Sequence, residues 1–281
     1  MKLSVFFLYV LRVAEQENIS LDEALDYAVK LGYTGIDIDQ EEIKKYPDTL
    51  AKIKQHGLTV CNVYGEYDLL NGKQADAFAL IDYAVESGAK VAMLLPGLFD
   101  KAKITDEMKT SPQAMKKFLT TNEKAQRALS AIKKTVEYAK QKGVYLTIES
   151  FGNPHSLTSY ISQIEWLLSQ VEGLKFTFDI GNFYLNGQDI FLAYDKFAKK
   201  SVHVHCKDYL TSPRVGEQDF SYAKISVPVG SGAAPTQEIA ERFLDGGYDG
   251  YFTVEYLGVE GSAEVMKQSA EYFKGMFEKR R

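Results

Sequence analysis

The sequence has few of the residues on which disulfide frameworks and thiolate metal sites depend. Its 281 residues include only 2 cysteines, Cys61 and Cys206, and 4 histidines, and no CxxC pair occurs. Two cysteines cannot build a disulfide framework, and this usage favours a reducing, cytoplasmic location. With so few histidines, any metal site must be rich in carboxylates.

Glycine-rich phosphate motifs, excess positive charge and long apolar runs are also lacking. No GxGxxG or GxxxxGK[ST] motif occurs, and the formal net charge is −5. Nucleic-acid backbones bind clustered Lys and Arg, so we expect no nucleic-acid partner. The apolar run 3–11 is interrupted by Arg12 and soon followed by acidic residues, so it is interpreted as a buried strand rather than a signal peptide. We therefore expect no membrane partner, and whether the chain forms a homo-oligomer stays open.

Short runs rich in β-branched and aromatic residues alternate along the chain with segments of helical periodicity. The expected strands lie at 3–11, 35–39, 59–64, 90–96, 144–149, 175–179, 202–205 and 250–255. The expected helices lie at 21–31, near 50–56, and at 75–88, 125–142, 158–170, 190–200, 236–244 and 263–278. No linker interrupts this alternation, which predicts a (β/α)₈ TIM barrel with residues 1–281 as a single α/β domain. A doubly wound sheet is the alternative, but it usually carries a glycine-rich first turn.

Two connections are longer than the others. Residues 97–122 follow the fourth expected strand, and residues 208–234 follow the seventh. Connections of this length in a compact domain commonly serve function. We expect both to lie over the mouth of the barrel and to close over a substrate.

Four of the later strands share a pattern of polar residues. They read TIE, TFD, HVH and TVE and end at Glu149, Asp179, His205 and Glu255. Because side chains alternate along a strand, both polar residues of each triplet face the barrel interior, and the last one lies at the carboxyl-terminal mouth. The four side chains are therefore predicted to converge.

Such a group needs a cation, because three buried carboxylates repel one another and lose their hydration. Oxygen donors with one imidazole suit Mn²⁺, Mg²⁺ or Co²⁺, and Zn²⁺ stays open. The plainer interpretation, strand-end polar residues bound to loop amides, explains any one of the four by itself. It does not explain four in register on successive strands.

The motifs IESFG, FDIGN, HVHCKD and FTVEY resemble the xylose isomerase-like TIM barrel family of sugar phosphate isomerases and epimerases. The family includes tagatose/psicose 3-epimerases, hydroxypyruvate isomerase, inosose dehydratase and endonuclease IV. Motif by motif, the resemblance implies that Glu149, Asp179, His205 and Glu255 are metal ligands. In the epimerase members, Glu149 and Glu255 would also be the acid–base pair.

The sequence departs from the ketose epimerases at two positions. Asn182 stands where they usually carry a histidine, and Thr211 stands where they carry a substrate-gripping arginine, so the nearest arginine here is Arg214. Asn182 and Arg214 are therefore candidate substrate contacts, while the exact ketose specificity stays open.

Further candidate substrate contacts lie beside these motifs. Lys207 shares the face of His205 and is predicted to balance the negative site or hold a substrate oxygen, against the alternative of a solvated lysine. His203 lies one layer deeper, where a hydrogen-bonded support for a ligand is the favoured role over a ligand itself. Tyr64 ends the third strand and either stacks on a sugar face or packs at the rim.

Two aspartates share one face of the second expected strand. Of these, Asp39 either reaches the mouth or caps the next helix, and Asp37 lies deeper. No role follows for Asp37 from the sequence.

The predicted function is a metal-dependent sugar isomerase or epimerase that removes a proton next to a carbonyl, through an enediolate, on a small carbohydrate. A lyase or dehydratase acting on a keto-sugar or keto-inositol needs the same metal and base, and is the alternative. An endonuclease IV-like hydrolase would need histidines on the first four strands, which offer none. A sugar-binding barrel without catalysis would not need all four ligand types.

Overall fold

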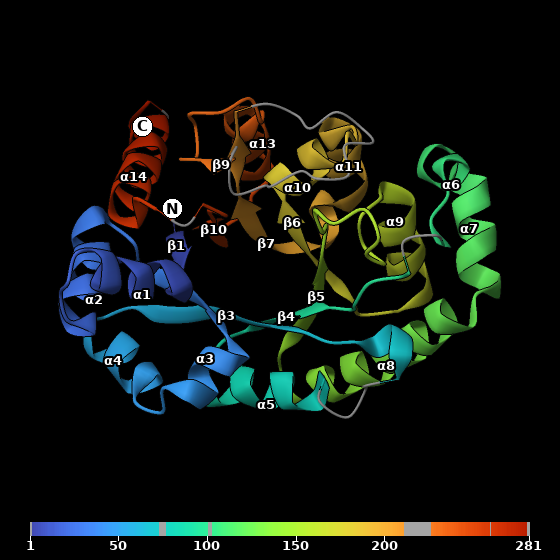
Figure 1. Ribbon diagram of the computed structural model, residues 1–281, viewed down its shortest axis with the longest axis horizontal. Coiled ribbons are helices and arrows are strands. Elements are labelled where there is room, and N and C mark those ends of the chain that lie inside the picture. The colour runs from blue at the N-terminus through green and yellow to red at the C-terminus, as the bar shows by residue number, and fades with distance from the viewer. Residues whose placement is uncertain (1, 73–76, 101–102, 211–225, 259, 280–281) are drawn as a thin grey trace.

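The computed structural model describes residues 2–72, 77–100, 103–210, 226–258 and 260–279. Its central feature is a closed barrel of parallel strands in the order β1-β10-β7-β6-β5-β4-β3-β2 (Figure 1). The strands are β1 Lys2–Phe6, β2 Gly35–Asp39, β3 Thr59–Glu66, β4 Val91–Leu95, β5 Tyr145–Glu149, β6 Lys175–Asp179, β7 Ser201–Cys206 and β10 Tyr251–Val254. Two short strands, β8 Asp208–Tyr209 and β9 Ser226–Val227, pair antiparallel above β7.

Helices surround the barrel on all sides (Figure 1). They are α1 Phe7–Gln16, α2 Leu21–Leu31, α3 Gln40–Lys45, α4 Thr49–Gln55, α5 Ala77–Ser87, α6 Asp106–Thr110, α7 Pro112–Thr121, α8 Glu123–Lys142, α9 Ile161–Gln170, α10 Ile180–Leu185, α11 Ile190–Phe197, α13 Thr236–Asp245 and α14 Ser262–Glu278, with 3₁₀ turns η1 Leu69–Asn71 and η3 Ala198–Lys200. The last helix, α14, lies beside α1 and α2, and the Tyr33 hydroxyl donates to the Met266 carbonyl at 2.8 Å. The predicted TIM barrel is therefore confirmed. None of the helices in the described ranges combines the length and hydropathy that crossing a membrane would need.

The local expectations differ from the structure in several places, and α3, β8 and β9 were not expected. The first strand ends at Phe6, and α1 begins at Phe7, because the apolar run also places Phe7, Val10 and Val13 on one buried helical face. A continuous apolar run is compatible with a buried strand and with the buried face of a helix, so the sequence does not show where one ends and the other begins. Residues 97–122 are expected to be irregular apart from a helix-compatible stretch at 113–119; α7 confirms that stretch, whereas α6 was not expected. Helix α10 follows β6 without a connection.

Alternation along the strands separates an aromatic shell from a polar interior. On β6, Phe176 and Phe178 face the helices, where Phe178 packs edge-on against Phe243 of α13 at 5.2 Å between ring centroids. The intervening Thr177 faces inward and shares a 2.8 Å hydrogen bond with Thr147 of β5. Because burial of the outer rings stabilises the strand, the inner positions are free to carry polar groups.

A layer of hydroxyl groups crosses the barrel interior. Besides Thr147 and Thr177, Ser4 of β1 and Thr253 of β10 share a hydrogen bond of 2.6 Å. All four side chains are fully buried. Buried hydroxyls need partners, so this layer provides donors and acceptors beneath the carboxyl-terminal end of the barrel.

His56, after α4, makes a pH-dependent contact with α2. Its ring nitrogens lie 3.1 Å from Asp22 and 2.7 Å from Asp26, and these hydrogen bonds raise the pKa of His56. Stability from a raised histidine pKa is fully present below the unfolded value and is lost as pH rises through the folded value. We expect His56→Gln to lower the melting temperature more at about pH 5.5 than at about pH 9. Lys54→Gln on α4 is the matched control, and an equal loss at both pH values would contradict the assignment.

Candidate metal centre and active site

Four side chains meet at the carboxyl-terminal end of the barrel. Glu149 ends β5, Asp179 ends β6, His205 lies near the end of β7 and Glu255 follows β10. One ligand atom from each lies within 4.8 Å of those of the other three, and all four residues are buried. Adjacent parallel strands end at the same rim, so the shared sequence pattern brings these groups together.

The chemistry of this group fits a divalent cation. The Nδ1 atom of His205 lies 2.6 Å from Glu149 Oε1 and 3.4 Å from Glu255 Oε2. Among the described residues, the buried Asp179 Oδ2 and Glu255 Oε2 have no hydrogen-bond partner of good geometry. Burial raises the pKa of Asp179 well above its usual range, and the neighbouring Glu149 and Glu255 carboxylates add to the rise. A cation bound there would relieve this repulsion.

Lys207 supplies a positive charge at the same place. Its ammonium group lies 2.9 Å from Asp179 Oδ2, 3.0 Å from Glu255 Oε1 and 3.9 Å from Glu149 Oε1. Burial opposes the charged form, but Asp179, Glu255 and Glu149 outweigh it and raise the pKa of Lys207. Burial opposes the charged form of His205, but contacts with Glu149, Asp37 and Glu255 outweigh it and raise the pKa of His205. Protons therefore offset part of the negative charge that a bound cation would otherwise offset.

Asp37 lies beneath the four residues and carries a dense set of hydrogen bonds. Its Oδ2 atom lies 3.0 Å from His205 Nε2 and 2.7 Å from His203 Nε2. Further donors to its carboxylate are Asn62 Nδ2 at 2.9 Å, Cys61 Sγ at 3.0 Å and Thr253 Oγ1 at 3.2 Å. Burial alone would raise the pKa of Asp37, but His203 and His205 outweigh burial and hold it well below its usual range.

This contact fixes the orientation of the His205 ring. When His205 is neutral and its Nε2–H donates to Asp37, the Nδ1 lone pair faces the carboxylates. A carboxylate that holds a histidine in this way is the usual support of a metal-ligating imidazole. Asp37, His203 and His205 also form a second set of closely spaced ligand atoms, but the hydrogen bonds already made by Asp37 fit a supporting role.

The structure places the other predicted residues in different surroundings. Tyr64 packs against Phe6 with ring centroids 5.0 Å apart, and Phe6 in turn packs edge-on against His205 at 5.0 Å. The Asn182 side chain donates to the Ser150 carbonyl at 2.7 Å, so its amide holds the segment after β5. Thr211 and Arg214 lie outside the described residues.

His203 and Asp39 also have defined places. His203 lies below the mouth, in the polar layer, with its Nε2 atom 2.9 Å from Thr253 Oγ1. Asp39 begins α3 as its N-cap, and its Oδ1 atom accepts from the Glu41 amide at 2.8 Å. The two alternatives for Asp39, a place at the mouth and a cap of the next helix, are therefore compatible, because the end of β2 is also the start of α3.

Sequence reasoning missed the role of Asp37. The available signal was its inward-facing position two residues before Asp39, at the depth of His203 on β7. Its partner His205 is 168 residues away in the chain, and only the closed barrel brings β2 and β7 across from each other.

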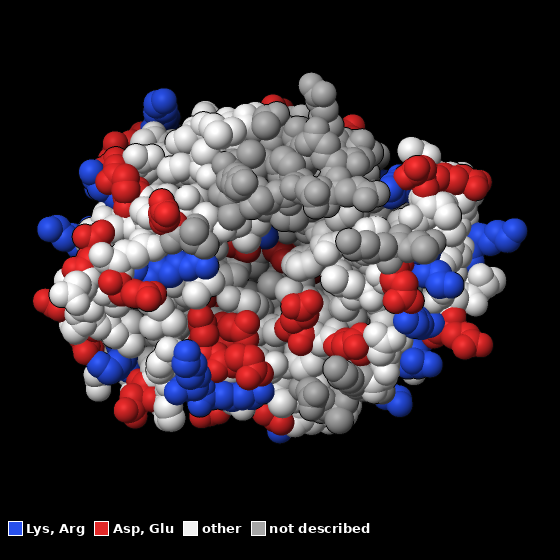
Figure 2. Space-filling model, viewed as in Figure 1, with Lys and Arg blue, Asp and Glu red and all other residues white. Residues whose placement is uncertain are grey.

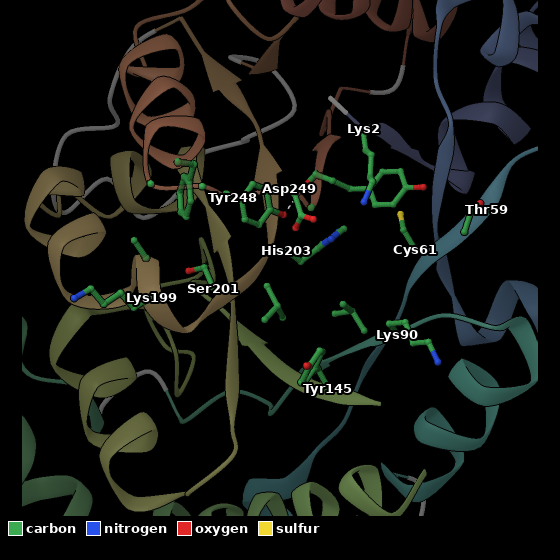
Figure 3. Close-up of a pocket in the computed structure, with 18 of the residues that line it drawn as sticks. Lys2, Thr59, Cys61, Lys90, Tyr145, Lys199, Ser201, His203, Tyr248 and Asp249 are labelled. Carbon is green, nitrogen blue, oxygen red and sulfur yellow. Dashed lines mark hydrogen bonds between the residues drawn. The ribbon is translucent and has the colours of Figure 1, made fainter. Parts of the chain in front are cut away.

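A cavity of about 810 Å³ lies at the opposite, amino-terminal end of the barrel (Figure 3). The first residues of several strands line it, among them Thr59, Tyr145, Ser201 and Tyr251. His203 and Cys61 reach it from the polar layer, and none of the four candidate ligands does. Chemistry in (β/α)₈ barrels takes place at the carboxyl-terminal face, so this cavity is separate from the candidate active site.

Residues 25–276 match the model of the xylose isomerase-like TIM barrel family. The chain belongs to this family. A comparison with curated protein sequences gave no significant match.

Solved structures share the fold at low sequence identity. The IOLI protein with a bound zinc atom is 18% identical, with 99% of each chain covered and a TM-score of 0.74. The probable 3-DHS dehydratase AsbF from Bacillus anthracis is 17% identical, with 98% of this chain and 99% of that chain covered and a TM-score of 0.73. The 3-keto-D-glucoside 4-epimerase YcjR from E. coli is 17% identical, with 90% of this chain and 94% of that chain covered and a TM-score of 0.68.

The carboxylate group leads to a prediction about metal content. Protein purified without chelator should hold about one divalent ion per chain, and Mn²⁺ or Mg²⁺ should raise its melting temperature, because a ligand of the native state alone opposes unfolding. His205→Ala should lose most of the metal, whereas His56→Ala on the surface should keep it. Elemental analysis without metal, together with no stabilisation by either ion, would argue against the site.

The Asp37 contact leads to a second prediction. Asp37→Asn should weaken metal binding by about 10–100-fold, because the amide no longer fixes the His205 ring as a carboxylate does. Competition with a chromophoric chelator measures this affinity. Asp39→Asn, on the same strand, should leave it nearly unchanged, since Asn also caps helices well. Equal metal affinity in Asp37→Asn and the unaltered protein would remove Asp37 from this role.

Proposed function

We propose that the protein is a metal-dependent isomerase or epimerase of small carbohydrates. The observation that carries this proposal is that carboxylate oxygens of Glu149 and Glu255 both approach the same imidazole nitrogen, His205 Nδ1, at 2.6 and 3.4 Å. Two carboxylates beside a cation site form a pair of bases that can reach a substrate held between them. Membership of the xylose isomerase-like family supports the same reaction class.

Each proposed ligand also has a chemical task. Glu149, Asp179, His205 and Glu255 would hold Mn²⁺, Mg²⁺, Co²⁺ or Zn²⁺, and a bound cation would polarise a substrate carbonyl and lower the cost of an enediolate. One glutamate removes the proton next to the carbonyl. If the other glutamate returns a proton on the opposite face, the carbon is epimerised. If the first returns it to the adjacent carbon, the product is an isomer.

Lys207 positions the second glutamate in this proposal. Its ammonium bridges Asp179 Oδ2 and Glu255 Oε1, which restricts the Glu255 carboxylate to one orientation. Glu149 instead receives its main contact from His205. The two glutamates therefore have different neighbours, and we expect them to have different roles.

A dehydratase is the second candidate, and Lys207 is the observation that favours it. A buried ammonium 3.0 Å from Glu255 can protonate a departing hydroxyl after Glu149 has taken the neighbouring proton. The similar fold of the probable dehydratase AsbF agrees with this candidate at the level of fold. Loss of water would give an unsaturated ketone with strong ultraviolet absorbance, whereas epimerisation gives none.

A small carbohydrate is the proposed partner in either case. The cytoplasmic location, the lack of a nucleic-acid partner and the question of a homo-oligomer stay predictions from the sequence.

Deuterium exchange of single-glutamate variants tests the two-base reaction. In D₂O, Glu149→Gln and Glu255→Gln should each stop turnover. Each should still exchange the proton next to the carbonyl in one epimer only, because the remaining base faces one side of the carbon. The two variants should prefer opposite epimers, as read by NMR of each epimer of a panel of keto sugars.

The metal content of each variant must be measured alongside, because glutamine keeps only one ligand oxygen. Exchange that depends on one glutamate alone would indicate isomerisation by a single base. Full exchange by a metal-loaded Glu149→Gln/Glu255→Gln double variant would exclude both residues as bases.

A further inference from the structure

The rim beside the candidate metal site is acidic. Asp39 ends β2, Glu42 lies on α3 and Glu66 ends β3. Figure 2 shows acidic atoms beside the central hollow, over α3, with basic atoms over the same helix on the side away from the hollow. Burial raises the pKa of Glu42 to about 7, and the Asp39 charge adds to the rise. Burial also raises the pKa of Asp39, with Glu66 adding to the rise. The carboxylates of this rim would repel a further negative charge brought close to them.

Tyr64 connects this rim to the site. Burial raises the pKa of its hydroxyl, and the charges of Glu42, Asp39 and Glu255 add to the rise. The Tyr64 ring therefore lies within the field of the rim carboxylates and of a candidate metal ligand. A substrate group that approaches over Tyr64 is therefore exposed to the negative charge of the rim carboxylates and of Glu255.

Of the basic side chains whose charge acts on these carboxylates, Lys44 is paired with Glu41 of α3 at 2.6 Å. The others contact groups outside the rim. Lys207 is held by Asp179 and Glu255. Arg12 donates to the Gly258 carbonyl at 2.7 Å, and its guanidinium lies over the Tyr9 ring. Lys45, which also acts on Glu42, lies over the Tyr46 ring at 5.1 Å.

The segment after β7 holds an anion of its own. In many (β/α)₈ barrels, backbone N–H groups after strands seven and eight bind a phosphate. Here the Asp208 carboxylate accepts from four backbone amides, those of Tyr209, Gly230, Gly232 and Ala234, at 2.9–3.0 Å. A Cβ atom at Gly232 would clash with Asp208 Oδ1, so the carboxylate approaches the backbone closely. These amides are not available to a ligand.

We infer that the substrate carries no phosphate or other strongly anionic group, so that the site takes an uncharged keto sugar or cyclic polyol ketone. This inference rests on the proposed function and narrows its substrate class. Residues 211–225 lie outside the described residues, and their sequence contains two basic and two acidic residues. The test includes an Arg214→Gln variant, because the sequence made Arg214 a candidate substrate contact.

Paired substrates test the inference. The metal-loaded protein is given free ketohexoses and the same ketohexoses as 6-phosphates, and kcat/KM is measured by proton exchange in D₂O. We expect the phosphate group to lower kcat/KM by at least about tenfold, and high salt to narrow the gap by screening. The triple variant Asp39→Asn/Glu42→Gln/Glu66→Gln should reduce this difference in kcat/KM by about tenfold. The substituted Asn and Gln side chains preserve the cap of α3.

A control variant separates local charge from net charge. Glu137→Gln/Glu165→Gln/Glu271→Gln changes the net charge equally on exposed positions of α8, α9 and α14. This control variant should leave the ratio of kcat/KM for the free sugar to kcat/KM for its 6-phosphate unchanged. An equal effect of both triple variants would overturn the role of the rim.

Binding of inorganic phosphate gives a readout that does not depend on turnover. Phosphate should not raise the melting temperature of the Mg²⁺-loaded protein. Stabilisation by phosphate that Arg214→Gln abolishes, or a kcat/KM for the 6-phosphates equal to or above that for the free sugars, would overturn the inference. If neither kind of sugar is turned over but free sugars alone stabilise the loaded protein, the proposed function fails and the charge selection stands.

Discussion

The burial of negative charge at one end of the barrel is the constraint on which the site depends. Asp37, Glu149 and Asp179 are at most 2% exposed, and Glu255 is 9% exposed. A carboxylate taken from water without partners costs several kcal/mol, so each must be hydrogen-bonded, paired with a positive charge or bound to a metal. The polar interior layer, the Lys207 ammonium and the two neighbouring histidines together meet this requirement.

The buried carboxylates differ in how many hydrogen-bond donors and positive charges surround them, and this difference separates a structural role from a chemical one. Asp37 accepts from five hydrogen-bond donors and is fully buried. Asp179 Oδ2 and Glu255 Oε2 have fewer partners, since the Lys207 ammonium lies 2.9 Å from the first and His205 Nδ1 lies 3.4 Å from the second. A protein accepts an incompletely compensated charge where function uses it, and a bound cation then stabilises the fold as well.

Periodicity along the chain was enough to predict the barrel and its four candidate ligands, whereas contacts that depend on closure of the barrel were not predicted. Glu149, Asp179, His205 and Glu255 converge because of alternation on successive strands, which is a local signal. The contact of Asp37 with His205 joins strands that are distant in sequence, so no role for Asp37 was predicted. The boundary at Phe6 was missed because one apolar run fits both a strand and a helix. The hydrogen bonds of Asn182 to the backbone depend on loop geometry, which the spacing of residues does not encode.

The pairing of β1 with β10 has a consequence for how the chain is made. Ser4 and Thr253 share a hydrogen bond although 249 residues separate them, and β1 is also paired with β2 on its other side. Until the last strand has left the ribosome, one edge of β1 has no neighbour, and the growing sheet exposes backbone groups there. Closure between such distant segments is slow, and exposed edges favour aggregation. The early packing of α1 and α2 against β1 and β2 would then protect the nascent sheet until α14 completes the ring.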